Sequence, residues 1–359
     1  MIPLSEMALR PVGWLAEEGP EADRVLSTRI RLARNLRGVH FVGKALDEDL
    51  TRGCQRITDA AVDLPQFAGG GAVLVGELPI VDRQFLLERH LISHDLASDT
   101  RARGLVLSPD EGLSIMVNEE DHLRLQAMRG GLRLEEAMAA ARELDETLAG
   151  RLDYAWTPEL GYLTACPTNV GTGMRASVLV HLPALVLTQK IKKILTGVGQ
   201  VGLTVRGFYG EGSEVVGNFF QLSNQVTLGE DEEETLSKLT RVVRQILDWE
   251  EKAQERLMRD AGLQIEDKCL RALGVLRYGR LLSSQELIAL LSAVRLGHSL
   301  GLRSVPPVAV LNDLLVRGQP AHLQKAVGRE MTSEERNEHR ARLVQETLRA
   351  AEQSKLDAA

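Results

Sequence analysis

Cysteine is scarce in this chain, and the three cysteines that occur form no recognisable pattern. Cys54, Cys166 and Cys269 lie far apart in sequence, so they offer neither the paired spacing of a zinc site nor a disulfide framework. An odd set of unpaired thiols is typical of a protein that works in a reducing compartment, so we expect a cytoplasmic location.

Long apolar runs and aromatic residues are also scarce. No stretch approaches the roughly 20 apolar residues that a membrane-spanning helix needs, and no apolar signal-peptide segment follows Glu6. We therefore expect no membrane span and no membrane partner. Aromatic residues make up 4% of the chain, so the core must be built from leucine, valine, isoleucine and alanine.

Two common phosphate-binding patterns are absent. The sequence contains no Gly-x-x-x-x-Gly-Lys-Ser/Thr loop and no His-Arg-Asp loop of the protein-kinase type. The net charge of −7 also argues against direct nucleic-acid binding, which usually requires a basic surface. If this protein transfers phosphoryl groups, arginine side chains must hold the phosphates instead.

The 359 residues are enough for two domains, and the pattern changes near residue 260. The first part, 1–260, mixes short aliphatic strands with amphipathic helices, which predicts an α+β domain rich in antiparallel strands. The second part, 261–359, has helical stretches alone, and its last helix begins with a capping box at Thr332–Glu335. We predict helices at 48–62, 134–148 and 232–259, and strands at 72–78, 104–108, 113–118, 162–165, 203–208 and 219–228.

The most informative segment runs from Cys166 to Val178. It places a thiol, a Gly-Thr-Gly turn and Arg175 within ten residues of one another. We predict a strand at 162–165 before the turn and a helix at 176–186 after it, so that the free N–H groups at the helix start would form an anion site. The alternative is a tight turn beside a buried structural cysteine, because short glycine motifs are common.

Five arginines lie beside glycines, turns or strand ends. Arg29 and Arg31 are two residues apart, so in an extended chain both would face the same side. The planar guanidinium fork suits polyphosphate because it makes two charge-assisted bonds to oxygen at once. Each arginine taken singly could be an ordinary surface residue. The full set comprises Arg29, Arg31, Arg124, Arg175 and Arg206.

Carboxylates occur at two further turns. Glu119, Glu120 and Asp121 follow a predicted strand, and Glu211 lies between Gly210 and Gly212. A pair of carboxylates and a cysteine is what a guanidinium substrate would need. The carboxylates would bind the cation, and one of them would remove a proton as the nitrogen attacks phosphorus. The alternative for residues 119–121 is a solvated acidic turn.

Together these motifs resemble the signature set of the phosphagen (guanidino) kinase family. They occur in the family's order across residues 27–211, as Ser-Thr-Arg-Ile-Arg, Asn-Glu-Glu-Asp-His-x-Arg, Cys-Pro-Thr-Asn-x-Gly-Thr-Gly-x-Arg-Ala-Ser-Val and Arg-Gly-x-x-Gly-Glu. Only 26 residues precede the first motif, and a helical extension follows residue 260. Both features resemble the bacterial branch that phosphorylates arginine in proteins. The resemblance implies a glutamine-synthetase-like antiparallel sheet flanked by helices, then a small all-α domain for phosphoarginine binding and dimerisation.

The resemblance also implies roles for individual residues. Glu120 would be the general base, Cys166 would contact the substrate nitrogen as a thiolate, and Glu211 would hold the other edge of the guanidinium. Magnesium would be held by phosphate oxygens and water, with Glu119 in its outer shell. His90 would lie at the nucleotide, although a partly buried structural histidine is the alternative. The implied ATP and phosphate contacts are Ser27, Thr28, Arg29, Ile30, Arg31, His90, Arg124, Arg175, Ala176, Ser177, Val178, Arg206, Gly207, Phe208, Tyr209, Gly210 and Glu211.

A fifth motif lies in the helical extension. The branch carries Arg-Asp-x-x-Arg-Ala there, which forms an allosteric phosphoarginine pocket, and the match here is Arg336, Asn337, Arg340 and Ala341. The two arginines are four apart, so they share a helix face. Asparagine replaces the aspartate that would bind the guanidinium more strongly. The alternative is a solvated, charged helix face.

The implied function is an ATP- and Mg²⁺-dependent kinase that phosphorylates arginine side chains of proteins. The implied partners are arginine-bearing protein substrates, a Clp-type ATPase and protease, a small zinc-binding activator protein and a second copy of the chain. Together they imply a role in protein quality control and the stress response. Two alternatives stay open: a kinase of free guanidino metabolites, and a catalytically silent adaptor that binds phosphoarginine.

Overall fold

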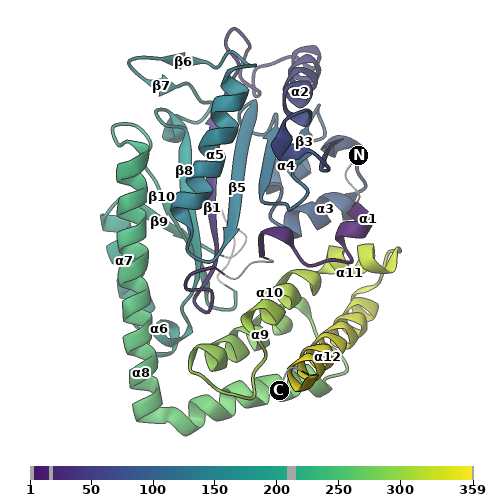
Figure 1. The fold of residues 1–359 in the computed structure, drawn as a ribbon, viewed down its shortest axis with the longest axis vertical. Helices are drawn as coiled ribbons and strands as arrows, with labels where there is room; N and C mark the ends of the chain where they lie inside the picture. Colours follow the sequence, from purple (N-terminus) through teal and green to yellow (C-terminus); the bar gives the residue numbers. More distant parts are fainter. Residues whose placement is uncertain (1–3, 16–18, 208–215, 358–359) are drawn as a thin grey trace.

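The computed structural model describes residues 4–15, 19–207 and 216–357. Its centre is an eight-stranded sheet in which every pair of neighbours is antiparallel (Figure 1). The strand order is β2-β3-β4-β5-β1-β8-β10-β9. The bounds are β1 Val25–Arg34, β2 Gly71–Leu74, β3 Gly104–Leu107, β4 Leu113–Val117, β5 Leu123–Gly130, β8 Met174–His181, β9 Leu203–Arg206 and β10 Phe219–Asn224.

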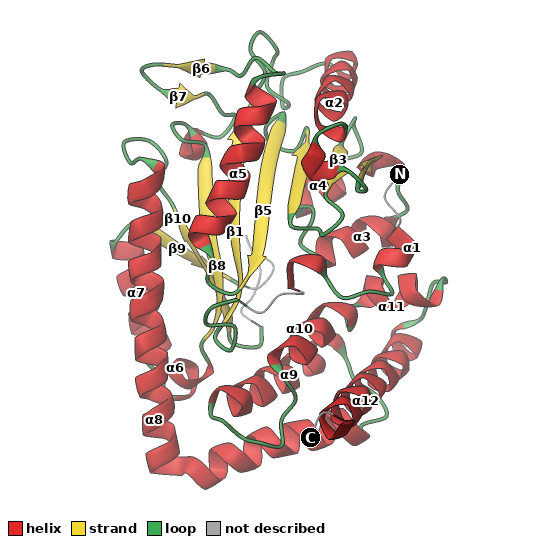
Figure 2. Ribbon diagram, in the orientation of Figure 1, coloured by secondary structure: helices red, strands yellow, loops and turns green. Residues whose placement is uncertain are grey.

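One face of the sheet carries the main hydrophobic core. Helix α5 packs on β1 and β5, and α8 packs on β8 and β10 (Figure 2). The odd- and even-numbered residues of each strand point to opposite faces. As a result Ile30, Leu32, Ala176 and Val178 are buried in this core. The helices of the first part are α1 Leu4–Met7, α2 Asp47–Val62, α3 Ile80–Glu88, α4 His94–Ser98, α5 Leu134–Ala149, α6 Pro183–Leu187 and α7 Ile191–Gln200.

Helix α8 runs from Glu232 to Tyr278 and leads out of the sheet region. The predicted helix at 232–259 is confirmed, and Asp231 and Glu234 form a capping box at its start. The helix continues further than predicted and breaks once, at Ala261, where the backbone is non-helical (φ −149°, ψ 34°). The predicted domain boundary near residue 260 coincides with this kink, and the division into two domains stays a prediction.

All elements that the structure describes after the kink are helical, as predicted. They begin with the rest of α8, and the last one, α12, starts with the predicted reciprocal cap between Thr332 and Glu335. A second apolar cluster joins these helices to Leu179, Met128 and Phe219 of the sheet. The helical part therefore covers one end of the sheet face opposite α5. The bounds are α9 Ser284–Ser299, α10 Val308–Arg317, α11 Pro320–Val327 and α12 Ser333–Asp357.

The elements that the sequence predicted lie near their observed positions, with one clear error, and the central strands β1 and β5 were not among them. The predicted helix at 176–186 is wrong, because β8 occupies Met174–His181 and only a short helix, α6, follows it. Side chains of the run Ala-Ser-Val-Leu-Val point alternately to the two faces of the strand, and both faces are buried. Apolar residues therefore occur at successive positions, and the sequence lacks the alternation of apolar and polar residues that indicates a strand. The predicted strand at 162–165 is reduced to β7, Gly161–Tyr162, which pairs with β6, Trp156–Thr157.

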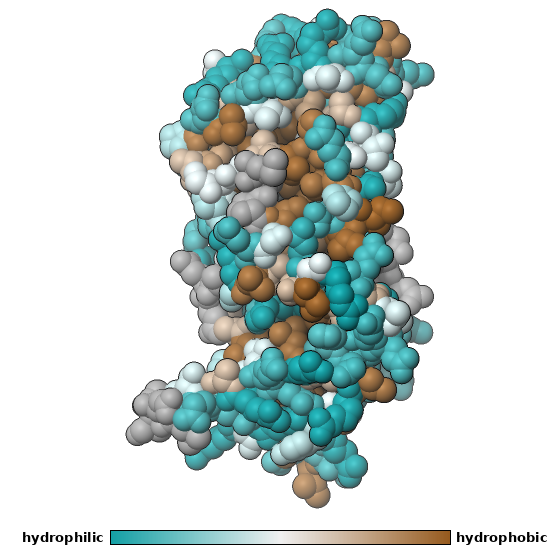
Figure 3. All heavy atoms as spheres, turned by 90° about the vertical axis from the view of Figure 1, so that its right-hand side faces the viewer, coloured by the Kyte–Doolittle hydropathy of each residue, from teal (hydrophilic) through white to brown (hydrophobic). Residues whose placement is uncertain are grey.

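The edge of the sheet at β2 exposes apolar side chains. Leu74 is 44% exposed and Ile80, just beyond, is 77% exposed. Figure 3 looks at this side of the molecule and shows hydrophobic residues gathered between two largely hydrophilic ends. Within the described residues, no helix combines the length and apolarity needed to cross a bilayer.

The end of α3 connects the sheet region to α11 through a buried polar chain. The Glu88 carboxylate accepts the backbone N–H groups of Ala321 (3.0 Å) and His322 (3.0 Å) at the start of α11. Arg89 donates to Nε2 of His322 (3.0 Å) and to the Glu111 carboxylate. The ring can accept at Nε2 only if Nδ1 carries the hydrogen, and Nδ1 lies 3.4 Å from Glu88. Burial raises the pKa of Glu88 from its ordinary 4.5 to about 7, opposed by these hydrogen bonds.

Replacing Glu88 with glutamine should change how stability depends on pH. A carboxyl group whose pKa is raised by folding stabilises the fold fully below pH 4.5, and that contribution disappears as the pH rises to about 7. Between these values the wild type should lose up to about 3 kcal/mol relative to Glu88→Gln. Urea unfolding at a series of pH values measures this difference. Glu146→Gln, on the solvent-exposed face of α5, is the control. A difference that stays constant from pH 4.5 to 7 would contradict the assignment.

Candidate active site

A cavity of about 680 Å³ opens on the sheet face opposite α5. Cross-strand pairing brings its basic residues together, because Arg31 lies opposite Arg175 on β8 and Arg206 lies opposite Gln221 on β10. Side chains that face each other across antiparallel strands share one face of the sheet. The predicted residues that line the cavity are Arg29, Arg31, His90, Glu119, Glu120, Arg124, Cys166, Arg175 and Arg206.

Other predicted contacts lie elsewhere. Thr28 and Ile30 are buried on the opposite face of β1, as are Ala176 and Val178 on β8, so their side chains do not line the cavity. Ser27 and Ser177 line a much smaller cavity beside it, together with Arg29 and His90. Gly207 is buried at the end of β9 and is not among the lining residues. Phe208, Tyr209, Gly210 and Glu211 lie outside the described residues.

The predicted anion site at a helix start does not form, because Arg175 belongs to the central strand β8. The glycines before it serve a different purpose. Gly171 (φ +110°) and Gly173 (φ +64°) adopt backbone conformations that other residues rarely reach. A Cβ on Gly171 would lie 2.3 Å from the carbonyl oxygen of Thr227. The turn is therefore a tight chain reversal that delivers Arg175 into the sheet beside Arg31.

The crowded guanidinium groups influence one another. Burial and the charges of Arg124, Arg175 and Arg206 lower the pKa of Arg29 to about 10. Burial and the same repulsion, mainly from Arg29, lower the pKa of Arg31 well below its ordinary value. Such a cavity favours a ligand that carries several negative charges, because each anionic oxygen relieves both effects.

Two neighbouring glutamates occupy different environments. The Glu119 side chain is fully buried and accepts hydrogen bonds from Ser93 Oγ (2.6 Å), Arg124 Nη1 (2.5 Å) and the backbone N–H of Glu120 (3.0 Å). Burial alone would raise the pKa of Glu119, but Arg124 and the two hydrogen bonds hold it below its ordinary value. Glu119 is thus a fixed anion that orients Arg124.

Glu120 is the carboxylate that reaches into the cavity. Its side chain is 40% exposed and makes only long contacts, to Arg124 Nη2 (3.3 Å) and Asn169 Nδ2 (3.5 Å). Burial raises the pKa of Glu120 above its ordinary value, and the negative charges of Asp121, Glu119 and Asp95 add to this effect, while Arg124 opposes it. A carboxylate with a raised pKa and few fixed partners is suited to accept a proton.

The third acidic residue ties this turn to the cysteine. One oxygen of Asp121 accepts hydrogen bonds from Asn35 Nδ2 (2.6 Å) and from the backbone N–H of Ala165 (2.7 Å), the residue before Cys166. The thiol of Cys166 is half-buried and lies 3.0 Å from the hydroxyl of Thr168. The alternative of a solvated acidic turn is therefore wrong for Glu119 and Asp121, which are buried and hydrogen-bonded.

His90 lies in the turn that directly follows α3. Its backbone has a positive φ of 59°, and its ring packs edge-on against Trp14. Burial, followed by the charges of Arg29 and His94, lowers the pKa of His90 to about 3, so the ring is neutral at physiological pH. It lines the cavity and is half-buried, and its contact with a nucleotide stays a prediction.

Several lining residues were not predicted. Gln221 accepts a hydrogen bond from Arg29 (3.1 Å), and Ser93 holds Glu119. Thr168 and Asn169 lie inside the cysteine motif and could have been found from it. The other polar ones come from the start of α4, from β9 and from β10 and the residue after it, with no sequence signal that joins these segments: Ser93, His94, Asp95, Thr204, Gln221 and Gln225.

The residues of the fifth motif lie on α12, far along the chain from this cavity. Arg340 is 1% exposed and donates to the carbonyl oxygens of Gly318 (2.6 Å) and Leu282 (2.6 Å) and to Oδ1 of Asn337 (2.8 Å). Burial and the charge of Arg336 lower the pKa of Arg340 to about 10. Ala341 is buried in the helical core. The solvated helix face is wrong for Arg340, and the phosphoarginine pocket stays a prediction.

The side chains around the cavity offer little to a resident metal ion. The described residues contain no group of three or more His, Cys, Asp or Glu side chains placed to hold one. Glu119 is already engaged by three donors, which leaves Glu120 and Asp95 as the lining carboxylates with free capacity among the described residues. The set fits a magnesium ion carried mainly by phosphate oxygens and water, as Mg²⁺ prefers, and does not fit an all-protein metal cage.

Comparison with known families identifies both parts of the chain. The family model for "ATP:guanido phosphotransferase, C-terminal catalytic domain" matches residues 60–253. The model for "Protein-arginine kinase McsB C-terminal domain" matches residues 262–358. The kink at Ala261 lies in the short gap between the two matched segments.

Curated relatives match over nearly the full length. A protein-arginine kinase of Moorella thermoacetica is 48% identical over 93% of this chain and 97% of its own. One from Symbiobacterium thermophilum is 46% identical over 94% and 96%. Among solved structures, a lombricine kinase has a TM-score of 0.57 and 26% identity over 68% of this chain and 70% of its own. A duplicated taurocyamine kinase of Schistosoma mansoni has a TM-score of 0.59 and 25% identity over 71% and 38%.

The arginine cluster makes a prediction about polyanion binding. Arg31→Gln should weaken binding of inorganic tripolyphosphate by about tenfold to a hundredfold, because one charge-assisted bond is lost. The unliganded variant should be no less stable than the wild type, because a buried, repelled charge is removed. Calorimetric titration and thermal unfolding measure the two effects. Arg56→Gln, on the solvent-exposed face of α2, is the matched control. Equal affinities of the wild type and Arg31→Gln for tripolyphosphate would exclude Arg31 from the anion site.

Proposed function

Because the chain belongs to the ATP:guanido phosphotransferase family, we propose that it transfers the γ-phosphoryl group of ATP to arginine side chains of proteins. One observation carries the proposal: Glu120 and Cys166 line the same cavity as five arginines. The arginines suit a triphosphate, and the carboxylate and thiol suit the cationic guanidinium. The two substrates can therefore meet in one place.

The transfer has a simple balance of bonds and protons. A terminal nitrogen of the substrate arginine attacks the γ-phosphorus, and the bond from that phosphorus to the bridging oxygen of ADP breaks. The attacking nitrogen gives up one proton, which Glu120 accepts. Arg29, Arg31, Arg124, Arg175 and Arg206 hold the phosphate oxygens and neutralise the charge that moves onto ADP. Bound magnesium would neutralise part of the same charge.

The neighbours of Glu120 determine how readily its carboxylate accepts a proton. Glu119 fixes Arg124 on one side, and Asn169 reaches the Glu120 carboxylate on the other. Cys166 as a thiolate would contact the attacking nitrogen, and its position is fixed by the hydrogen bond from Ala165 to Asp121. Glu211 would hold the far edge of the guanidinium, as the family motif implies.

A protein acceptor is favoured by the relatives that match over almost their whole length. The protein-arginine kinases share 44–48% identity with this chain, whereas the lombricine and taurocyamine kinases share 25–26%. The match to a protein-arginine kinase C-terminal domain points the same way. Transfer to a free guanidino metabolite is the second candidate, supported by the structural similarity to those two kinases.

The wider setting is part of the same proposal. It comprises a cytoplasmic homodimer, a small zinc-binding activator protein and a Clp-type protease that removes the marked proteins under stress. It also includes a phosphoarginine pocket on α12 around Arg336, Asn337, Arg340 and Ala341. In that pocket Arg340 would have to exchange its bonds to Gly318 and Leu282 for bonds to phosphate.

The acceptor is tested with labelled ATP and either casein or free arginine. We expect label on casein, stable in mild alkali and lost in acid because the P–N bond is acid-labile. Glu120→Gln should reduce kcat by about a hundredfold or more, the usual loss for a general base. Glu136→Gln on α5 is the exposed control. Label on free arginine alone would exclude the protein-kinase function, and full activity of Glu120→Gln would remove the base.

The pH profile tests the setting of Glu120. The base must be ionised, so kcat/KM should fall as the pH drops through the pKa of Glu120, and this should happen above the ordinary range of glutamate. Asp95 raises that pKa, so Asp95→Asn should move the acid limb to lower pH. Asp59→Asn, on α2, should leave the limb in place. A limb that is identical in the wild type and Asp95→Asn would contradict the electrostatic origin of the shift.

A further inference from the structure

A second groove, of about 700 Å³, lies behind the loop that carries Cys166. The β6–β7 hairpin forms one wall and the start of α8 forms the other (Figure 1). We propose that this groove binds the polypeptide on either side of the target arginine, and that it selects segments carrying a second basic side chain beside an apolar one. The inference rests on the proposed function, because it concerns the same acceptor.

The groove exposes apolar surface on a rigid frame. Trp156 and Leu160 of the hairpin are each 46% exposed, and Leu228 opposite is 51% exposed. Tyr162 anchors the hairpin to the rest of the structure. The Arg34 guanidinium carbon lies 3.4 Å from the centre of the Tyr162 ring, and the Tyr162 backbone pairs with that of Gly171. Arg34 is in turn fixed by Asp145. Exposed apolar side chains on a fixed scaffold are typical of a binding surface.

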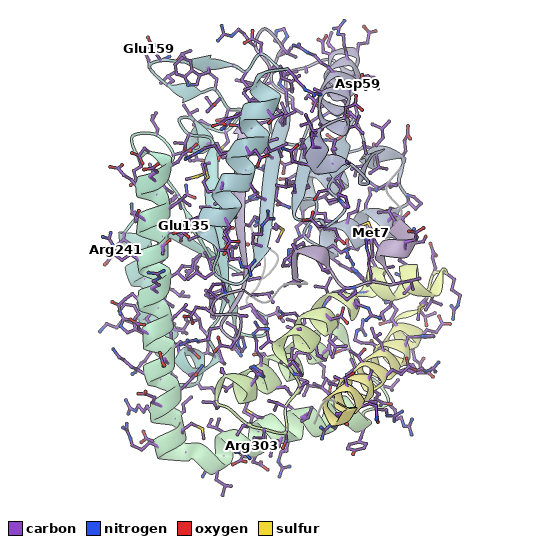
Figure 4. The ribbon with its side chains drawn as sticks, viewed as in Figure 1. Met7, Asp59, Glu135, Glu159, Arg241 and Arg303 are labelled. Carbon is purple, nitrogen blue, oxygen red and sulfur yellow. The ribbon has the colours of Figure 1, made fainter. Side chains whose placement is uncertain are left out.

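The charge of the groove fits a cation. Five carboxylates line it, at Glu159, Glu230, Asp231, Glu232 and Glu233, against one guanidinium, that of Arg142. Arg142 pairs with Glu232, Lys238 pairs with Glu230, and Asp231 caps α8. The side chains of Glu159 and Glu233 make no hydrogen bond or ion pair to any described residue. Glu159 stands at the tip of the hairpin, away from the sheet (Figure 4).

These features together point to lysine or arginine. A cationic side chain on the face of Trp156 would gain a cation–π contact, and Glu159 or Glu233 could pair with its head. The same carboxylates would repel nucleic acid and acidic peptides. The exposed Leu160 and Leu228 would receive an apolar neighbour of that cation. A basic, partly apolar segment of a protein substrate is the occupant that meets all of these conditions.

One short segment of the chain, residues 166–172, contributes to both the active-site cavity and the groove. The Thr227 hydroxyl, on the groove side, donates to the carbonyl oxygens of Thr168 (2.8 Å) and Val170 (2.7 Å). Thr168 itself lines the cavity beside Cys166. From Cys166 to Gly171, which lines the groove, the chain can extend no more than about 17 Å. An extended substrate covers that distance with about five residues, so the second basic residue lies within about five positions of the target arginine.

The test uses two synthetic peptides that differ at one position. Both carry the target arginine and, four to five residues away, a leucine next to either lysine or glutamate. We expect the wild type to phosphorylate the lysine peptide with a KM about five- to tenfold lower and a similar kcat. The Trp156→Ala/Glu159→Gln double variant should lose this preference and keep its KM for ATP. Glu159→Lys should reverse the preference.

A matched control removes the same two side-chain types elsewhere. Trp249→Ala/Glu255→Gln lies on α8, and Trp249 is about 25 Å along that helix from Glu232. Trp249 is 41% exposed, and the Glu255 side chain is also exposed. This control should keep the preference of the wild type. Equal KM values for both peptides with the wild type, or an unchanged preference in the Trp156→Ala/Glu159→Gln variant, would overturn the inference.

A binding measurement separates this inference from the proposed function. Fluorescein-labelled peptides in which lysine replaces the target arginine cannot be phosphorylated on arginine, and fluorescence polarisation reports their affinity. Tighter binding of the lysine-leucine peptide, lost in the Trp156→Ala/Glu159→Gln variant, supports the groove even if no peptide is phosphorylated. Equal binding of both peptides overturns it even if casein is phosphorylated.

Discussion

The site depends on holding five guanidinium groups close together in one cavity. Like charges at such distances repel, and burial removes the water that would weaken the repulsion. Two features make the arrangement possible. The antiparallel sheet fixes the strands through backbone hydrogen bonds, so the arginines cannot separate. Glu119 supplies one permanent counter-charge from the β4–β5 turn. Burial of the apolar core on the other face of the same strands offsets the destabilising effect of this cluster.

The acceptor side is organised by hydrogen bonds between separate parts of the chain. Asp121 joins the acidic turn to the residue before Cys166, and Thr227 joins the far end of the cysteine loop to β10. As a result the turn that carries Glu120 and the loop that carries Cys166 are fixed to the same frame as the arginines. Glu120 keeps few fixed partners, which is the condition that the proposed proton acceptor requires.

The end of α3 links this frame to the helical part. Three consecutive residues serve three neighbours there: Glu88 caps α11, Arg89 joins Glu111 and His322, and His90 lines the cavity. A movement of α11 would therefore be transmitted to the cavity wall within two residues. Arg340 contributes to the same region through its bonds to Gly318 and Leu282. The C-terminal helices are thus mechanically joined to the active-site face.

The sequence alone determined the elements with a strong local signal. The amphipathic helices α2 and α5, the first part of α8 and the capped start of α12 follow from periodicity and capping chemistry. The spacing of Arg29 and Arg31 also fixed their common face, because alternation along a strand is a local property. Only the tertiary structure decided that residues 174–181 form a strand, since a strand buried on both faces has no distinctive period. It also decided that Glu119 is a buried anchor while Glu120 faces the cavity, and that Gln221 and Ser93 join the site. Those outcomes depend on neighbours that are distant in the chain, and no local pattern encodes them.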